Sequence, residues 1–306
     1  MSSSNNNLKN FVSIVITTKN EEFHIENCLS SIFTQILTNI DIEVIIVDNF
    51  SIDRTEIISK KFPVQFYQIG PERNIQRNFG LLEKAKGDYL VWIDADHIIH
   101  PLLIESCTKY LNIHSDVVAL MVPEVILGNS FYSKTRRFER QFYEGTVIDG
   151  SRFIRSSVFR SIGGFSNEWL HGPDDWDLDL KLLKYGDIHL LKIFGDCGEQ
   201  FSKLMIERFN INPNKYPISK FHNESSLTLI NHLKKKKHYS SNFNQYIKNW
   251  GENHPSIKKQ LGFYYRFFIV FFENGKWKLI LNNPILFCGI LFNKFLTGII
   301  FYIYKK

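Results

Sequence analysis

The sequence predicts an α/β fold, with a mostly parallel open sheet and helices on both of its faces. Two observations support this prediction. Short apolar segments alternate with segments of helical periodicity along the first 120 residues, and continuous apolar strands joined by helices are typical of a parallel sheet buried on both faces. Polar residues also collect directly after the apolar segments, where open sheets of this kind bind their ligands.

The expected elements alternate along the chain. Strands are expected where short runs are apolar and β-prone, and helices where apolar residues recur every three or four positions. The expected strands are residues 11–17, 42–47, 64–67, 89–93 and 117–122, and the expected helices are residues 22–35, 55–61, 75–86 and 101–112.

The composition is that of a globular protein. The 306 residues are 44% hydrophobic and 22% charged, which is enough chain for one large or two modest domains. Four scattered cysteines without a C-x-x-C spacing predict neither a disulfide framework nor a zinc site, and they favour a reducing cytosol. Residues 1–10 are polar, lack the apolar stretch of a secretory signal, and are expected to form a loose tail.

Basic clusters flank an aromatic-rich C-terminal region. Lysines at 234–237 and 305–306 bracket two apolar stretches at 261–272 and 285–304, a combination that predicts helices attracted to an anionic membrane surface. The stretch 285–304 is long enough to span a bilayer but carries Asn293 and Lys294 near its middle. We therefore expect an interfacial or re-entrant helix. The alternative is that these helices cover an apolar face of the protein or of a dimer.

Asp94 and Asp96 follow the strand expected at residues 89–93. Side chains alternate along a strand, so these two carboxylates are expected on one side of the chain, a spacing that suits Mg²⁺ or Mn²⁺ carrying phosphate oxygens. The alternative is a pair of solvated loop carboxylates. The first strand is not followed by G-x-G-x-x-G, and no P-loop motif occurs in the sequence. A divalent cation would then supply the counter-charge for a bound diphosphate.

A second acidic group, Asp174 and Asp175, follows some eighty residues later. Pro173 is well placed to open a helix, so both acids are expected in its first turn. Their role could be structural, because acids in that position complement the helix dipole. It could also be chemical, because the two acidic groups together suggest a metal-assisted reaction on a phosphorylated substrate.

An ordered set of motifs over residues 11–225 resembles the family 2 glycosyltransferases, which have the GT-A fold. The motifs are IVITTKNEE at 14–22, VIIVDNFSIDRT at 44–55, RNFG at 77–80, GDYLVWIDAD at 87–96, FRSIGGF at 159–165 and GPDDWDLDLK at 172–181. The resemblance implies transfer of a sugar from a nucleotide-diphosphate sugar, with inversion at the anomeric carbon. Two alternatives remain: a nucleotidyltransferase, although no glycine- and lysine-rich triphosphate loop follows the first strand, and a non-catalytic sugar-binding scaffold.

The resemblance also implies roles for individual residues. Asp175 is expected to be the general base, and Asp174, which replaces the usual glutamate, a positioning or acceptor contact. The expected donor contacts are Thr17, Lys19 and Glu21 in the first segment, Asp48 at the base, Arg77 near the pyrophosphate or ribose, and Asp94 at the ribose or the metal. The expected metal ligands are Asp96, Asp94 and His222.

Several of these residues could instead have a structural role or be solvent-exposed. Arg77 could be a solvated arginine at a helix start, and His222 an ordinary polar loop residue. Asp53, with Ser51, is expected to cap the helix that starts at Thr55 rather than to contact a ligand. Two further assignments are modest: His97 is expected to neighbour the site rather than to ligate, and Lys181 to be a charge partner.

The expected organisation is a tail at 1–10, a catalytic domain at 11–225 and a helical extension at 226–306. The extension suggests a lipid-linked acceptor, although a polysaccharide precursor fits as well. We expect a peripheral protein on the cytoplasmic face of a membrane. No nucleic-acid partner is expected, and a homo-oligomer is compatible with the sequence.

Overall fold

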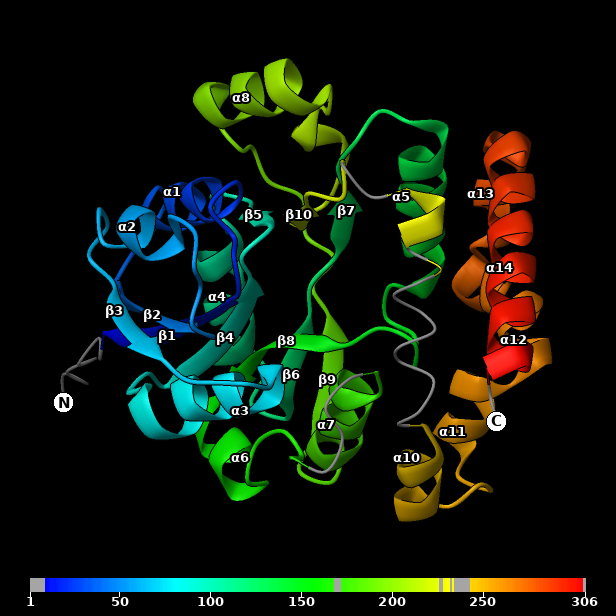
Figure 1. Cartoon of the computed structure of the whole chain (residues 1–306), viewed down its shortest axis with the longest axis horizontal. Helices are drawn as coiled ribbons and strands as arrows, with labels where there is room; N and C mark the ends of the chain where they lie inside the picture. Colours follow the sequence, from blue (N-terminus) through cyan, green and yellow to red (C-terminus); the bar gives the residue numbers. More distant parts are fainter. Residues whose placement is uncertain (1–8, 168–171, 226–227, 232, 234–242, 305–306) are drawn as a thin grey trace, which may run out of the picture.

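A computed structural model describes residues 9–167, 172–225, 228–231, 233 and 243–304 of the chain (Figure 1). The tail expected at 1–10 falls mainly outside the described residues, and Asn10 already begins the first strand. The strands are β1 (Asn10–Thr18), β2 (Ile40–Asp48), β3 (Gln65–Gln68), β4 (Tyr89–Asp94), β5 (His97–Ile99), β6 (Val117–Met121), β7 (Glu124–Ile126), β8 (Ser151–Arg155), β9 (Asp187–Leu190) and β10 (Lys220–His222).

Helices follow most of these strands. In the first two thirds of the chain they are α1 (Ile25–Phe33), α2 (Thr55–Ser59), α3 (Arg73–Asn78), α4 (Leu103–Ile113), α5 (Phe131–Tyr143), α6 (Ser156–Ser161), α7 (Asp174–Leu182) and α8 (Glu199–Phe209). In the last third they are α10 (Phe243–Trp250), α11 (Pro255–Leu261), α12 (Phe263–Phe267), α13 (Trp277–Asn282) and α14 (Pro284–Tyr304).

The main sheet has the strand order β3-β2-β1-β4-β8-β6-β9. Strand β1 pairs in parallel with β2 and β4, β2 pairs in parallel with β3, and β6 pairs in parallel with β9. Strand β8 runs antiparallel to its neighbours β4 and β6. The expected mostly parallel sheet is therefore confirmed.

Alternate residues of the central strands face two separate cores, as the period of two requires. Ile14 and Ile93 pack with α1 and α4 on one face, whereas Val15 and Trp92 pack with α6 and α7 on the other. The expected cover of helices on both faces is thus confirmed. The buried middles of these strands, such as residues 14–16, 44–47 and 89–93, are apolar because neither face meets water there.

The single helix expected over residues 75–86 is divided in two. Helix α3 ends at Asn78 and continues as a π-helical segment, Phe79–Lys84, in which the Ala85 N–H donates to the carbonyl of Gly80 at 2.8 Å. Gly80 lies against the sheet so closely that a Cβ there would stand 2.4 Å from Val15 Cγ1. The wider turn fits this approach, and π-helical segments of this kind often occur near functional sites.

A second, three-stranded sheet was not predicted. It has the order β5-β10-β7 and packs under α8 through Val125, Phe221 and Met205. Each of its strands is three residues long, so the sequence carries too little alternation to reveal it. This small sheet matters because β10 brings a distant part of the chain back beside β4 and β5.

The expected C-terminal helical extension is present as α10 to α14, and α5 lies between the sheets and these helices (Figure 1). Phe138 and Phe142 of α5 share a core with Phe271 and Ile290 of the extension. Among the described residues no single helix has the length and hydropathy to cross a bilayer. The segments Glu273–Asn282 and Pro284–Ile299 have the required length and hydropathy only when taken together, and the chain bends by 115° between them. The domain boundary expected at residue 225 stays a prediction.

Candidate active site

Polar residues from four strand ends meet at one edge of the sheet. Strands β1, β2 and β4 are parallel neighbours, so Thr18, Asp48 and Asp94 at their carboxyl ends share that edge. The turn after β4 leads to Asp96, and β10 ends at His222 opposite His97 of β5. The predicted convergence of separate polar segments is confirmed.

Asp48 ties the loops after β1 and β2 together. Its side chain is fully buried, and its Oδ1 accepts hydrogen bonds from Thr18 Oγ1 at 2.6 Å and Ser51 Oγ at 2.5 Å, while Oδ2 accepts the Ser51 N–H at 2.7 Å. These bonds give Asp48 a loop-ordering role. Its expected contact with a nucleotide base stays a prediction.

The first donor segment lies along the same loops. Thr17 is in register with Asp94 on the neighbouring strand, and the exposed Lys19 donates from Nζ to the carbonyls of Asn49 and Phe50 in the second loop. The backbone N–H of Glu21 donates to Thr55 Oγ1 at 2.8 Å. Contacts of these side chains with a donor stay predictions.

Asp53 binds the start of α2 from one residue before the N-cap position, which Arg54 occupies without a side-chain cap, so the N-cap predicted at Asp53 and Ser51 is not formed. Its Oδ1 accepts the backbone N–H of Thr55 at 3.0 Å, and its Oδ2 accepts the backbone N–H of Glu22 at 3.1 Å. The hydroxyl of Ser51 instead accepts the backbone N–H of Asn20 at 2.7 Å. Both side chains hold the polar loops in place.

Arg77 is the centre of a buried charge cluster. Only 1% exposed, its guanidinium donates to Asp94 Oδ1 and Asp174 Oδ2, both at 3.1 Å, and lies 3.5 Å from Asp175 Oδ1. The Phe165 ring packs 5.1 Å from Arg77 Cζ. The alternative of a solvated arginine is therefore wrong, because Arg77 joins the acids at the end of β4 to those of α7.

The two acids of α7 fall in its first turn, as the position of Pro173 predicts. Asp174 is 3% exposed and accepts hydrogen bonds from Arg73 Nη2 at 3.0 Å and from Arg77. Lys181, one turn beyond Asp177, pairs with it at 2.8 Å, which agrees with its expected role as a charge partner.

Asp175 is held between two arginines. Arg152 Nη2 on β8 donates to Asp175 Oδ2 at 2.8 Å, and Arg77 lies on its other side. Burial alone would raise the pKa of Asp175, but the positive charges of Arg152 and Arg77 outweigh it and hold this pKa below its ordinary value. Asp175 is therefore ionised at neutral pH, as a proton acceptor must be.

Asp96, His97 and His222 form a cluster suited to a divalent cation. Each offers one ligand atom, and these atoms all lie within 4.8 Å of one another. His222 Nε2 is 3.0 Å from Asp96 Oδ2, while the buried Asp96 Oδ1 accepts no hydrogen bond from the described residues. An unpaired buried carboxylate oxygen beside imidazole nitrogens fits a cation whose other ligands are phosphate oxygens.

Asp94 and His97 border the expected ligands Asp96 and His222. Asp94 ends β4 and pairs with Arg77, whereas Asp96 lies in the turn that follows and faces His222. His97 Nδ1 accepts the Asp94 N–H at 3.3 Å, which leaves the ring proton on Nε2. In this tautomer His97 lines the site as a neighbour rather than as a ligand.

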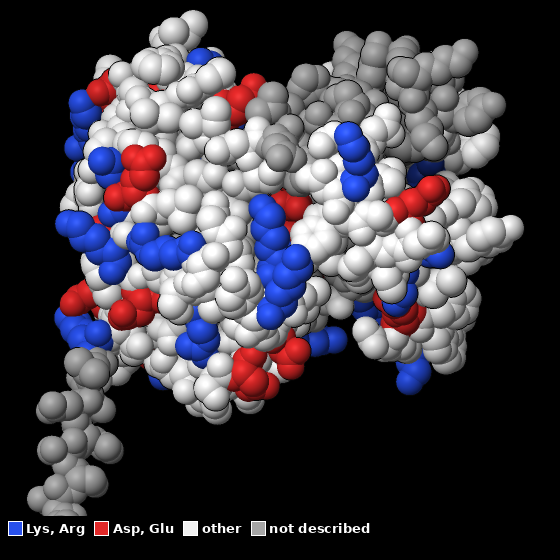
Figure 2. Space-filling view, turned by 90° about the horizontal axis from the view of Figure 1, so that it is seen from below, with Lys and Arg blue, Asp and Glu red and all other residues white. Residues whose placement is uncertain are grey.

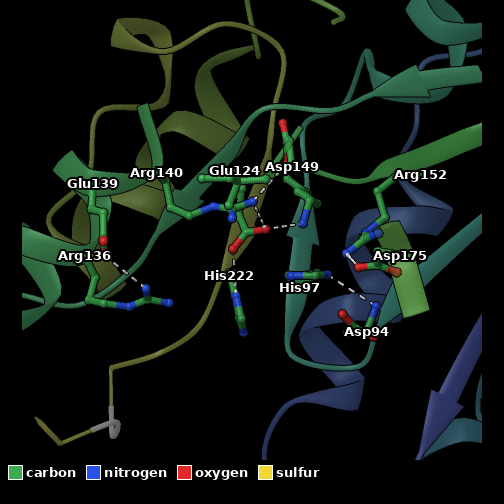
Figure 3. Close-up of polar contacts among 12 residues, drawn as sticks. Asp94, His97, Glu124, Arg136, Glu139, Arg140, Asp149, Arg152, Asp175 and His222 are labelled. Atoms are coloured by element: carbon green, nitrogen blue, oxygen red, sulfur yellow. Dashed lines mark hydrogen bonds and ion pairs between the residues drawn. The ribbon is translucent and has the colours of Figure 1, made fainter. Parts of the chain in front are cut away.

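Glu124 holds His222 from the side away from Asp96. Its Oε1 lies 3.1 Å from His222 Nδ1, and its Oε2 pairs with Lys220 and with Arg140 at 3.1 Å (Figure 3). Burial alone would lower the pKa of His222, but Asp96 and Glu124 raise it to about 10, so the ring would release a proton when a cation binds to Nε2. His222 is therefore not an ordinary loop residue, because two carboxylates fix its ring.

Sequence reasoning missed the residues that support the predicted acids. Arg73, Arg152, Glu124 and Lys220 belong to none of the recognised motifs. One signal was available: Glu124 is the only charged residue in the apolar run 117–127, where an acid needs a partner.

Comparison with known proteins supports the resemblance seen in the motifs. A family model described as glycosyl transferase family 2 matches residues 13–166. A glycosyltransferase of Rickettsia typhi is 27% identical over 195 residues, which cover 58% of this chain and 60% of that protein. A poly(ribitol-phosphate) β-N-acetylglucosaminyltransferase of Staphylococcus aureus is 24% identical over 159 residues, which cover 49% of this chain and 46% of that protein.

Among solved structures, a mannosyltransferase from Pyrobaculum calidifontis in complex with GDP-Man and Mn²⁺ has a TM-score of 0.58. The likeness covers 96% of this chain and 86% of that chain at 16% identity, which shows a shared fold. The match to the two sequence relatives spans only about half of their length, between 46% and 60%.

Proposed function

The chain belongs to glycosyltransferase family 2, and on that premise we propose that it transfers a sugar from a nucleotide-diphosphate sugar to an acceptor hydroxyl. One observation carries the proposal: the metal-suited cluster of Asp96 and His222 and the arginine-held carboxylate Asp175 lie at the same edge of the sheet. The two clusters can therefore act on one substrate. Asp94 and Arg77 lie between them.

The cation would be held by Asp96 and His222, and it would neutralise the diphosphate that leaves the sugar. Mn²⁺ and Mg²⁺ both suit this donor set. The mannosyltransferase of the same fold was solved with GDP-Man and Mn²⁺, which supports a divalent metal and a nucleotide-sugar donor for this chain. Thr17, Lys19, Glu21 and Asp48 would bind the nucleoside from the loops after β1 and β2.

Asp175 would be the general base. The acceptor oxygen bonds to the anomeric carbon as the bond to the diphosphate oxygen breaks, and the acceptor proton passes to Asp175. Attack opposite the leaving group inverts the anomeric configuration. Asp174 would be a positioning residue, because it accepts hydrogen bonds from both Arg73 and Arg77 and so orients two guanidinium groups beside the diphosphate.

The acceptor would be a lipid-linked glycan or a polysaccharide precursor. One relative is named for transfer to poly(ribitol-phosphate), which supports a polymeric acceptor. The aromatic C-terminal helices favour an acceptor presented at a membrane.

A thermal-shift screen of UDP-, GDP- and dTDP-sugars with and without Mn²⁺ or Mg²⁺ tests the proposal. We expect one donor to raise the melting temperature in the presence of metal, because a ligand at 100 times its Kd stabilises the folded state by about 2.7 kcal/mol. Asp96→Ala should lose the metal-dependent part of the shift. Asp88→Ala, at the opposite end of β4, is the matched control and should keep it.

The same screen separates the alternatives. Stabilisation by a nucleoside triphosphate together with a sugar phosphate would favour a nucleotidyltransferase. A donor that binds without metal and is never turned over would favour a sugar-binding scaffold.

A further inference from the structure

Helix α14 has two apolar faces, and only one of them is packed. On the inner face Phe287 and Ile290 join the core formed with α5, and Gly289 lies so close to α5 that a Cβ there would stand 2.8 Å from Thr135 Oγ1. Lys294, expected from the sequence to favour the lipid interface, is instead buried on this face. Its Nζ donates to Tyr143 Oη at 2.6 Å and to the carbonyl of Arg266 at 2.8 Å. The alternative, in which these helices cover an apolar face of the protein, therefore holds for this side.

The opposite face of α14 is an exposed apolar stripe. Its members recur at intervals of three and four residues, as one face of a helix requires. Ile285 is 73% exposed, Phe292 58% and Phe295 60%. The outer stripe consists of Ile285, Cys288, Phe292, Phe295 and Ile299. The outward face of a surface helix is normally polar. The outward face of α14 is apolar along this stripe, which is unfavourable in water.

Neighbouring segments extend the apolar surface. Phe268 and Phe272 lie between α12 and α13, Trp277 and Leu281 lie on α13, and all four are exposed. In Figure 2 white, uncharged surface predominates over the described C-terminal elements at the right, whereas charged side chains crowd the sheet domain at the left. Exposed large apolar residues gathered in one part of a chain favour an interaction site.

Charge identifies the partner. Residues 255–306 contain eight Lys or Arg and a single acid, Glu273, whereas the preceding 254 residues contain 29 Lys or Arg and 30 Asp or Glu. The excess positive charge of the chain therefore lies in the segment that carries the outer stripe. Two of the eight, Lys305 and Lys306, lie outside the described residues. An apolar aromatic surface in a basic segment complements an anionic bilayer.

We propose that the outer stripe of α14, together with the exposed aromatic residues of α12 and α13, docks on the surface of an anionic lipid bilayer. The protein would sit peripherally on the cytoplasmic face, with the stripe among the acyl chains and exposed lysines such as Lys258 and Lys278 near the headgroups. Docking itself does not depend on the proposed transferase activity. The lipid-linked acceptor does depend on it.

A chain of polar contacts connects the docking helix to the metal-suited cluster. Lys294 and Tyr143 Oη lie 2.6 Å apart, and Tyr143 donates to Glu139 at 2.6 Å. Arg136 pairs with Glu139 at 3.4 Å and with Glu224 at 3.3 Å, two residues beyond the end of β10. Docking would therefore hold the site at a fixed height above the bilayer.

The native cysteines supply a probe for this proposal. Cys28, Cys107 and Cys197 are buried, whereas Cys288 is exposed and belongs to the outer stripe. An environment-sensitive fluorophore on Cys288 should shift to the blue when vesicles of phosphatidylglycerol and phosphatidylcholine are added to the full-length protein. Phosphatidylcholine alone should give a smaller shift, and salt should weaken binding to the anionic vesicles.

The double variant Phe292→Glu/Phe295→Glu should bind these vesicles at least about 100-fold more weakly, because two aromatic side chains no longer leave water. Ile113→Glu, which changes an exposed apolar residue at the end of α4, is the matched control and should bind like the wild type. Donor binding by thermal shift should be equal in all three proteins. A failure of docking is thereby distinguished from a failure of the proposed transferase function.

Two results would overturn the proposal. If the fluorophore is already shielded without vesicles, and more so at higher protein concentration, the stripe is an interface between two copies of the chain. If the labelled wild type shows no shift with anionic vesicles, the stripe does not meet a bilayer, whatever the folding state of the variants.

Discussion

Glu124→Gln is predicted to weaken metal binding through a residue that does not itself belong to the metal-suited cluster. The substitution keeps the shape of the side chain and removes its charge. Glu124 Oε1 is 3.1 Å from His222 Nδ1, so the carboxylate orients the ring whose Nε2 faces Asp96. Carboxylates that support a metal-binding histidine in this way contribute roughly 10- to 100-fold to metal affinity. We expect Mn²⁺ to bind the variant more weakly by that factor.

The same substitution should also lower stability. The carboxylate is the ion-pair partner of the buried Lys220 and, at 3.1 Å, of Arg140. Removing one partner of a buried ion pair costs about 3–5 kcal/mol, which corresponds to a fall in melting temperature of roughly 5–15 °C. The loss is measured by thermal unfolding without metal, and Mn²⁺ affinity by electron paramagnetic resonance of the free ion at a temperature where the variant is folded.

Glu139→Gln is the matched control for this prediction. Glu139 is also buried and ion-paired, but its partners are Arg136 and Tyr143 rather than His222. The control should lose stability and keep the Mn²⁺ affinity of the wild type. If Glu124→Gln loses stability yet binds Mn²⁺ within twofold of the wild type, Glu124 only packs the core and the reasoning is refuted.

Three further substitutions follow from the site. Asp175→Asn should lose transfer by orders of magnitude and still bind donor; wild-type turnover would move the base elsewhere. Asp96→Ala should abolish metal-dependent turnover while the fold stays intact, and full activity of the wild type with a chelator present would refute the metal assignment. Asp179→Asn should stabilise the protein increasingly as the pH rises from about 4 to 8, because burial raises the pKa of Asp179 to about 8. The folded wild type keeps a proton that the unfolded chain releases over this window, which costs about 1.4 kcal/mol per pH unit; equal pH slopes in urea titrations would contradict this.

The sheet and its order of elements follow from the sequence because the strands are buried on both faces. Residues 44–47 and 89–93 form short continuous apolar runs, which indicate strands of a parallel sheet buried on both faces. The small sheet could not be predicted in the same way. Its strands pair across long stretches of the chain, His222 with both His97 and Ile126, and three residues carry no readable period.

The acids of the site could be predicted, but their partners could not. Asp94, Asp96 and Asp175 lie in motifs of fixed order. The role of Arg152 depends on the pairing of β8 with β4, which places its guanidinium 2.8 Å from Asp175. The sequence does not predict this pairing. Lys294 shows the same limit, because its helix turns it inward toward α5 although the sequence favours the lipid interface.

The most direct test of the central claim is ³¹P NMR of the protein with the donor selected in the thermal-shift screen, Mg²⁺, a candidate acceptor and added pyrophosphate. The account predicts that a nucleoside diphosphate appears and that the pyrophosphate signal is unchanged, with no reaction in Asp175→Asn. Formation of a nucleoside triphosphate and a sugar phosphate at the expense of pyrophosphate would contradict it.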